Sequence, residues 1–225
     1  MANAVTILGL FVSLFGAPLI LAASRTLKVE STAWSVRFAL WILSGLCVAM
    51  LFASVPDWEK VTASLGLRAP DGTSMLWGIA GASVMVLAAG LVATVQRAVG
   101  LPVGDREGFA RISRLPLEKR AFIVITAAVT EEIIYRGCAI ALGSAVLGSL
   151  WVAAALSIVA FTLAHFKWHA SHLLSVFLTG TIMTGLFLGT RDLWACMLAH
   201  FVVDAIGFLI VPALLKRRKS VDLSR

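Results

Sequence analysis

Charged side chains are scarce in this sequence. Only 14% of its 225 residues are Asp, Glu, Lys or Arg, whereas 60% are hydrophobic. A soluble domain has about a quarter charged and about half apolar residues. The shortage of charge therefore excludes an ordinary soluble domain and predicts an integral protein of the lipid bilayer. We expect residues 1–225 to form a single membrane domain, because the spans leave no room for a separate soluble unit.

Cysteine is rare as well, and a basic leader segment is missing. Cys47, Cys138 and Cys196 lie in apolar segments without the spacing of metal ligands. This is typical of small packing residues rather than of a disulfide or thiolate site. No Lys/Arg-rich segment precedes the first apolar stretch, so we expect Ala4–Ala23 to be a retained span and not a signal peptide.

Long apolar runs are what the chain has instead. A spanning helix needs about 20 mostly apolar residues. The runs divide into N-terminal helices within residues 1–95 and later helices within residues 121–215. We expect an all-α, polytopic membrane helix bundle of about seven spans, at Ala4–Ala23, Ala33–Val55, Ser74–Val95, Ala121–Leu142, Ala145–His165, His172–Thr190 and Leu193–Leu215.

Basic residues lie mainly in the loops between these runs. If the N-terminus lies outside, most of the 19 Lys and Arg residues, Arg37 and Lys167 among them, fall on the inside. Only Lys60, Arg68 and Arg191 fall on the outside. Because cytoplasmic loops are enriched in Lys and Arg, this bias predicts a multi-pass cell-membrane protein with a cytoplasmic C-terminus. The net charge of +7 therefore needs no nucleic-acid partner.

The connection from Gln96 to Arg120 allows two interpretations. Phe109, Ile112 and Leu115 recur every three residues among arginines. This pattern suits a short helix that lies on the anionic cytoplasmic face of the membrane. A solvated basic loop that only satisfies the topology is an equal alternative.

Ionisable residues inside the apolar segments carry the functional information. Glu131, Glu132 and Arg136 are the charged residues of Ala121–Leu142. A charge at the bilayer centre costs about 2.5–3.5 kcal/mol on insertion scales, so such residues indicate function. On a helix, Glu132 and Arg136 stand one turn apart in the order that favours an ion pair, and pairing offsets much of the cost. Glu131 points elsewhere, which leaves it free for chemistry.

Three further ionisable residues lie in the later apolar segments. His200 and Asp204 stand one helical turn apart on the last span, and His165 ends the fifth span. Isolated polar faces are costly in lipid. We therefore expect these residues to converge with Glu131 on one buried, wet pocket.

Such a pocket allows two kinds of chemistry. A desolvated glutamate can act as general base on a water, while an imidazole shares that water or stabilises an oxyanion. These groups would hydrolyse an amide without a covalent nucleophile. Alternatively, Glu131, His165, His200 and Asp204 could ligate a Zn²⁺ ion that activates the water. The usual helical zinc signature, His-Glu-x-x-His, is absent, and the spacing leaves both alternatives open.

Three motifs resemble those of a known family. Residues 131–136 (Glu-Glu-Ile-Ile-Tyr-Arg) resemble the Glu-Glu-x-x-x-Arg motif of the CAAX protease and bacteriocin-processing family, CPBP or Abi. Residues 161–165 resemble its Phe-x-x-x-His element, and residues 200–204 its His-x-x-x-Asn/Asp element. The first motif is the most specific, because paired glutamates and an arginine in one span are rare by chance.

The resemblance implies an α-helical intramembrane endopeptidase similar to the Ras-converting CAAX endoprotease. Its catalytic core would lie in residues 121–215, and its substrate would be a peptide or protein. By this analogy Glu131 and His165 activate the attacking water, and His200 and Asp204 hold the oxyanion. The family's glutamate-and-histidine mechanism can be written without a metal.

By the same analogy Glu132 and Arg136 are supporting residues. Two positions depart from the commoner pattern: Tyr135 stands where Phe is usual, and Asp204 stands where the CAAX-cleaving branch has Asn. An ionised Asp204 disfavours an oxyanion beside it. Asp204 could instead orient His200 or bind a metal.

Other classes of function fit the same residues. A non-catalytic membrane scaffold, such as an immunity protein that binds a peptide or partner protein, would keep its phenotype in a folded Glu131→Gln variant. A proton-coupled carrier would use buried Glu and His as a relay, but the chain shows no inverted repeat or broken-helix signature. The leading prediction is an endopeptidase of a prokaryotic membrane. Candidate substrates are exported peptides, bacteriocin precursors, signal-peptide remnants and membrane regulators.

Overall fold

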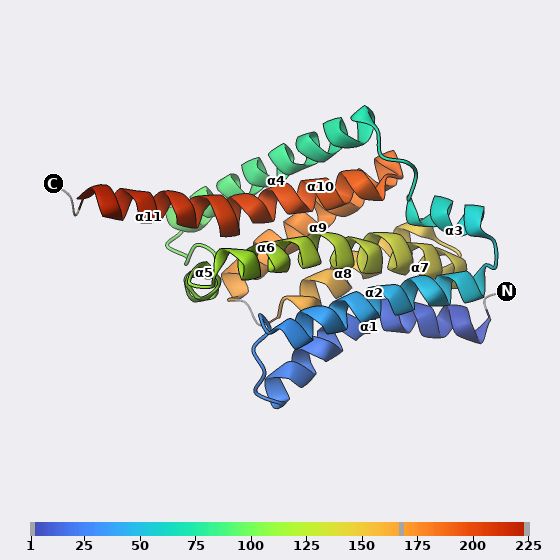
Figure 1. Cartoon of the computed structure of the whole chain (residues 1–225). Helices are drawn as coiled ribbons and strands as arrows, with labels where there is room; N and C mark the ends of the chain where they lie inside the picture. The colour runs from blue at the N-terminus through green and yellow to red at the C-terminus, as the bar shows by residue number, and fades with distance from the viewer. Residues whose placement is uncertain (1–2, 167–168, 223–225) are drawn as a thin grey trace.

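Helices lie side by side along one main direction in the structure, a computed structural model that describes residues 3–166 and 169–222 (Figure 1). No strand occurs among these residues. The prediction of an all-α bundle is therefore confirmed. Lys167, which the topology argument places on the inside, lies outside the described residues.

The helical elements follow one another with short connections. In chain order they are α1 (Ala4–Thr26), α2 (Trp34–Ser54), α3 (Trp58–Leu65), α4 (Gly72–Ala98), α5 (Arg106–Ser113), α6 (Leu117–Thr126), η1 (Ala127–Ala139), α7 (Ile140–Leu147), α8 (Leu150–Ala164), α9 (Ala170–Thr190), α10 (Leu193–Ala205), η2 (Ile206–Ile210) and α11 (Val211–Asp222). Two runs, α6–η1–α7 and α10–η2–α11, are each continuous and have a π-helical segment in the middle.

Five helices are long and apolar enough to cross a membrane: α1, α2, α4, α9 and the run from Leu193 to Lys216. Helix α8 is apolar but only 15 residues long. The α6–η1–α7 run, which carries the charged residues, is not among the five. Helices occupy all seven expected segments, but the count of seven spans is not confirmed.

Local capping explains why some helices begin or end away from their expected limits. Asp71 and Ser74 form a capping box, which starts α4 earlier than expected. Gly148 takes a left-handed backbone (φ 66°) after α7, and the Ser149 side chain caps α8. The expected span Ala145–His165 is therefore wrong at its start, because this turn lies inside it.

Two short helices lie between the long ones. Helix α5 forms in the connection after α4, capped by Asp105, and its Phe109 ring stacks on Phe208 of η2. Of the two interpretations of that connection, the structure has the helix. Helix α3 has no counterpart among the expected spans. It ends at Gly66, whose carbonyl accepts a hydrogen bond from the Leu193 backbone at the start of α10.

Two hydrophobic clusters hold the bundle together. The first is built mainly from α1, α2, α3, η1 and α8, and the second mainly from α4, α9 and α10. Helix α7 contributes Leu142 to the first cluster and Ile140 to the second. The glutamate-bearing run is thus anchored in both clusters, which limits how far its side chains can move.

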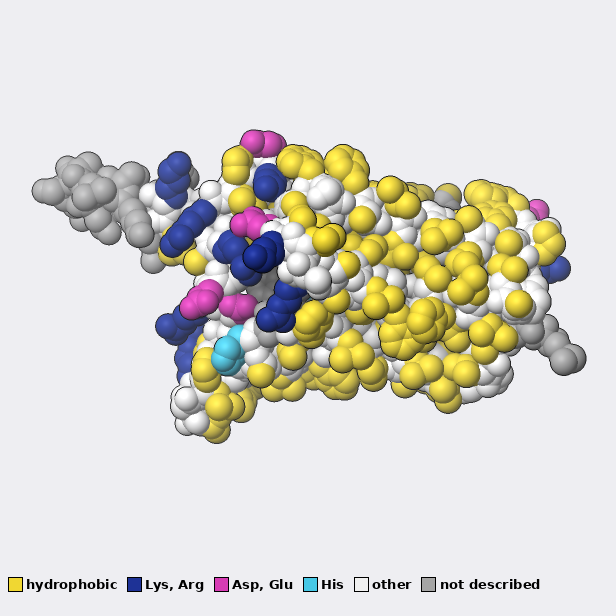
Figure 2. Space-filling view, turned by 90° about the horizontal axis from the view of Figure 1, so that it is seen from below, with side chains coloured by type: hydrophobic (Ala, Val, Ile, Leu, Met, Phe, Trp, Pro, Cys, Tyr) yellow, Lys and Arg dark blue, Asp and Glu magenta, His cyan; other side chains and the backbone are white. Residues whose placement is uncertain are grey.

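Charged side chains gather at one end of the bundle. Figure 2 shows basic and acidic side chains and a histidine around a hollow at the end where the C-terminus lies, whereas the rest of that face is mainly hydrophobic. The two termini lie at opposite ends (Figure 1). Large exposed apolar side chains on several long helices are what a lipid contact requires. These features support a multi-pass membrane protein.

Candidate active site

The acidic pair lies on a π-helix rather than on the ordinary helix that the sequence predicts. Helix η1 carries Glu131, Glu132 and Arg136. π-Helices are rare, mostly no longer than one turn, and frequent at functional sites. A neighbouring helix satisfies one of its carbonyls, since the Ser157 hydroxyl of α8 donates to the Tyr135 backbone oxygen at 2.7 Å.

Glu132 is the centre of a fully buried polar cluster. Its Oε1 accepts hydrogen bonds from Arg136 Nη1 at 2.8 Å and from His200 Nδ1 at 2.7 Å. Both Glu132 and Arg136 have no solvent exposure. The ion pair that the spacing favours is therefore present. Glu132 is also hydrogen-bonded to His200 on α10, a contact that the sequence reasoning did not predict.

Arg136 is held by α8 and α9 as well. Its Nη2 donates to the Gly180 carbonyl at 3.3 Å, and its guanidinium lies 4.4 Å from the centre of the Phe161 ring. A Cβ atom at Gly180 would meet that ring at 2.9 Å. Position 180 therefore requires glycine, because any side chain would push Phe161 into the cluster.

Glu131 faces His165 across a gap. His165 Nε2 lies 4.0 Å from Glu131 Oε2, which is too long for a direct hydrogen bond. His165 Nδ1 donates to the Phe161 carbonyl at 2.9 Å, because a carbonyl can only accept. This bond leaves Nε2 of a neutral His165 as an acceptor that faces the carboxylate. A single water can donate to both groups across such a distance.

His200 and Asp204 lie on one face of α10, as their spacing predicts. Asp204 Oδ2 is 3.7 Å from His200 Nε2, beyond hydrogen-bond distance, whereas Glu132 is hydrogen-bonded to Nδ1. The hydrogen bond that holds the His200 ring thus comes from Glu132, while Asp204 lies within ion-pair distance of Nε2.

All four residues with expected catalytic roles line one cavity of about 690 Å³. Glu131, His165, His200 and Asp204 are brought there by η1, α8 and α10, together with the Tyr135 side chain. The buried pair of Glu132 and Arg136 is not part of the lining. The structure thus brings the three polar faces together.

Arg37 is a lining residue that the sequence argument assigned to a cytoplasmic boundary. It lies in the first turns of α2 and interacts electrostatically with Glu131 and Asp204. Its Nε atom is buried and has no hydrogen-bond partner among the described residues. Sequence offers one signal for this position, an arginine inside an apolar helix.

The geometry does not support the zinc alternative. The described residues contain no group of three or more His, Cys, Asp or Glu side chains placed to hold a metal ion. Nδ1 of His200 is hydrogen-bonded to Glu132, and Nδ1 of His165 is hydrogen-bonded to the Phe161 carbonyl, so only the Nε2 atom of each ring is open to a ligand.

A comparison with known families finds a match to part of the chain. A family model described as type II CAAX prenyl endopeptidase Rce1-like matches residues 115–206. The resemblance to an Rce1-like domain is confined to this segment, which is less than half of the chain. The segment contains Glu131, Glu132, Arg136, His165, His200 and Asp204. The match supports a protease role and, with the apolar helices, a peptide substrate reached from a lipid bilayer. No curated protein and no solved structure matches the chain significantly.

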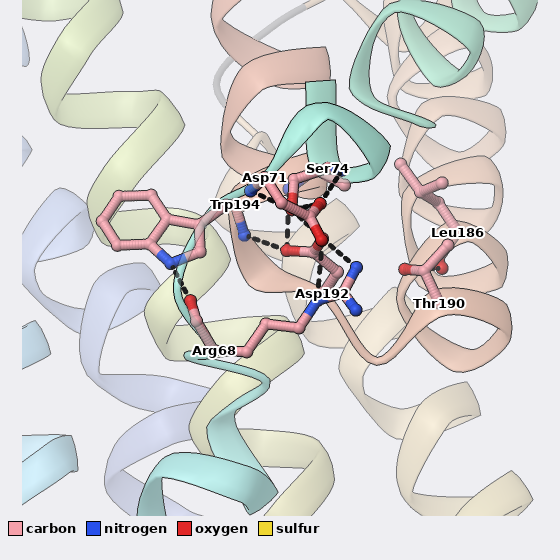
Figure 3. Close-up of polar contacts among 8 residues, drawn as sticks. Arg68, Asp71, Ser74, Leu186, Thr190, Asp192 and Trp194 are labelled. Carbon is pink, nitrogen blue, oxygen red and sulfur yellow. Dashed lines mark hydrogen bonds and ion pairs between the residues drawn. The ribbon is translucent and has the colours of Figure 1, made fainter. Parts of the chain in front are cut away.

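A second polar cluster lies at the start of α4 and α10, away from the cavity of the Rce1-like domain (Figure 3). We call Arg68, Asp71, Ser74, Asp192 and Trp194 the Asp192 clasp. The buried Asp192 carboxylate accepts hydrogen bonds from the Arg68 guanidinium, the Ser74 hydroxyl and the Trp194 backbone. The Trp194 indole donates to the Arg68 carbonyl at 2.8 Å. The clasp ties the loop before α4 to the start of α10.

The clasp keeps its aspartate ionised. Burial alone would raise the pKa of Asp192, but hydrogen bonds from Ser74, Arg68 and the Ala195 backbone outweigh burial and lower that pKa. The hydrogen bond to Asp192 in turn raises the pKa of Arg68. The clasp is therefore a charged contact that stabilises the bundle at neutral pH.

Proposed function

We propose that the protein is an intramembrane endopeptidase that hydrolyses peptide bonds with a water activated by Glu131 and His165. One observation carries the proposal. Glu131 Oε2, which has no hydrogen-bond partner among the described residues, faces His165 Nε2 across 4.0 Å in a cavity large enough for a peptide segment. Two acceptors at this separation hold a water with its lone pairs turned toward a substrate carbonyl.

The first step is attack of that water on the scissile carbonyl. The Glu131 carboxylate removes one proton as the new carbon–oxygen bond forms, and the carbonyl π electrons move onto oxygen. His165 Nε2 accepts the other hydrogen of the water as a hydrogen bond and keeps it oriented. The neutral Glu131 that results then protonates the leaving amine, and the carbon–nitrogen bond breaks.

His200 stabilises the oxyanion in this scheme. Its Nε2 faces the cavity, and its ring is locked by the 2.7 Å hydrogen bond to Glu132. When Nε2 carries a proton it can donate to the oxyanion, a contribution of several kcal/mol in comparable sites. Asp204 lies 3.7 Å from Nε2 and offsets the positive charge of the imidazolium. The imidazolium in turn compensates the negative charges of the Asp204 carboxylate and the oxyanion, which would otherwise repel each other. The buried ion pair of Glu132 and Arg136 fixes the arrangement.

The same proposal includes the topology and the extent of the domain. The whole chain, residues 1–225, would be one membrane domain, with helices within 1–95 covering a catalytic core within 121–215. The charged end seen in Figure 2 would face the cytoplasm, with the C-terminus. Peptides would then be cut near the cytoplasmic half of the bilayer.

The experiment compares peptide termini in membranes that express the wild-type protein or Glu131→Gln at matched levels. We expect new termini with the wild type and none with the variant, because the amide cannot take a proton from water. Glu59→Gln is the matched control, since Glu59 is an exposed glutamate on α3 outside the cavity. Identical termini in all three samples, with the phenotype intact in Glu131→Gln, would favour the scaffold or immunity protein instead.

A further inference from the structure

Lys and Arg side chains line the cavity, and among the residues that the structure describes all of them precede the Rce1-like segment. Arg25 comes from α1, Lys28 from the following turn, Arg37 from α2 and Arg111 from α5. The family match begins at residue 115, so it assigns nothing to these positions. Three separate parts of the chain therefore bring positive charge to one cavity.

Arg37 lacks the carboxylate partner that two other arginines have. Arg136 and Arg68 each form an ion pair with a carboxylate at 2.8 and 2.9 Å. In the described part of the chain Arg37 has no ion pair within 4.0 Å, and its buried Nε has no hydrogen-bond partner. A buried donor without an acceptor lowers stability, and more so when it is charged. A ligand that supplies the acceptor would recover this loss.

Three carboxylates also line the cavity, but none of them forms an ion pair with Arg37. Glu30 accepts a hydrogen bond from the Thr32 hydroxyl, near the rim. Glu131 and Asp204 attract Arg37 electrostatically without reaching it by an ion pair. Arg37 thus shares one cavity with the exposed basic residues and with Glu131. An anionic group held there would be part of a molecule that also reaches Glu131.

We propose that Arg37 is the centre of a carboxylate subsite for the peptide substrate, with Arg25, Lys28 and Arg111 at its rim. The proposal rests on the proposed function, because it places the carboxylate on the peptide that is cut. The carboxylate is an acidic side chain near the scissile bond or the C-terminal carboxylate of the peptide. The planar guanidinium binds either one through two parallel hydrogen bonds.

The test measures binding and cleavage with one set of probes. Fluorescein-labelled Leu/Ala peptides carry a single Glu, moved along the chain, or Gln in its place, and each is made as free acid and as C-terminal amide. Binding is measured by fluorescence anisotropy with the full-length protein in nanodiscs, in a Glu131→Gln background that does not cut the peptide. We expect a carboxylate to tighten binding roughly tenfold or more, as one charge-assisted hydrogen bond does.

Substitutions identify the group responsible. Arg37→Gln should remove the preference for the carboxylate, while Arg37→Lys keeps part of it because the charge remains. Arg97→Gln is the matched control, since Arg97 is exposed on α4 and does not line the cavity. Arg111→Gln, at the exposed rim, should weaken the preference severalfold, and it tests the subsite even if Arg37→Gln fails to fold. In the active enzyme, Arg37→Gln should raise KM for the carboxylate peptide more than it changes kcat.

The outcomes separate the subsite from the proposed function. Loss of preference with Glu→Gln in the peptide identifies a side-chain carboxylate, and loss with the amide identifies the C-terminus. Equal binding of all peptides, or a preference that survives both Arg37→Gln and Arg111→Gln, overturns the subsite even if the wild type cuts peptides. An Arg37-dependent preference in a protein that cuts no peptide supports the subsite and rejects the peptidase.

Discussion

The cavity that Glu131 lines and the Asp192 clasp contain the same kinds of charged group but differ in how fully those groups are hydrogen-bonded. In the clasp, Asp192 accepts from Arg68, Ser74 and backbone N–H groups, and none of its side-chain atoms is left unsatisfied. In the cavity, Glu131 Oε2 and Arg37 Nε are buried and have no hydrogen-bond partner among the described residues. The hydrogen-bonding groups of Asp192 are all used in the clasp, whereas Glu131 and Arg37 in the cavity can still form hydrogen bonds.

This difference indicates which cluster is built for chemistry. Buried polar groups in native proteins are nearly always hydrogen-bonded, so each exception needs a physical reason. Here the exceptions that line the cavity, Arg37, Glu131 and Tyr135, lie where a water and a substrate would supply the missing contacts. Stability of the clasp and activity of the cavity should therefore respond to substitution independently.

The largest effect should come from Glu131→Gln. Removing the proposed general base should lower the cleavage rate by about 10²–10⁴-fold, while the melting temperature changes little because Oε2 has no hydrogen-bond partner among the described residues. Rates on a cleaved peptide and thermal unfolding of the purified protein measure the two quantities. A variant that melts far below the wild type would show that Glu131 is structural, like Asp192.

Arg136→Met should have the next largest effect, on stability. It leaves Glu132 as a buried charge without its cation, a change that costs about 3–5 kcal/mol in buried pairs. Thermal unfolding in detergent measures the loss. The double variant Glu132→Met/Arg136→Met should recover part of the stability but no activity, because His200 loses the group that orients it. Recovery of activity in the double variant would contradict the role given to Glu132.

Asp192→Ala should destabilise the protein without changing its cleavage rate. Loss of this helix cap typically costs about 1–2 kcal/mol. Below the melting temperature the cleavage rate should stay at the wild-type value, because no clasp residue lines the cavity. Asp192→Asn keeps an acceptor and should lose less. A reduced rate in folded Asp192→Ala would break the separation between the two clusters.

The smallest effect is the pH dependence of the clasp. The pKa of Asp192 is lowered in the folded state. Its contribution is therefore fully present above the pKa of about 3.9 of an unfolded aspartate and is lost as pH falls through the folded value. The difference in melting temperature between wild type and Asp192→Asn should be constant near neutrality and shrink below about pH 4. A difference that grows with acidity would contradict this sign.

Particular residues show how far the sequence alone reaches. The ion pair of Glu132 and Arg136 follows from their spacing, because residues one turn apart face the same way on any helix. The contact of Glu132 with His200 could not be predicted, since these residues lie 68 positions apart and meet only when α10 packs against η1. The place of Arg37 in the cavity could not be predicted for the same reason, because Arg37 lies far in sequence from all three motifs.

The sequence by itself determined the class of this protein: a helical membrane protein with ionisable residues in its apolar segments, where each charge is costly. Composition, apolar runs and short-range spacing are enough for that, because they reflect transfer energies and helix periodicity. Only the tertiary structure decided that η1 is π-helical, that Glu132 is hydrogen-bonded to His200, and that Glu131 and His165 lie 4.0 Å apart. Those features depend on long-range packing, whose geometry no local pattern encodes.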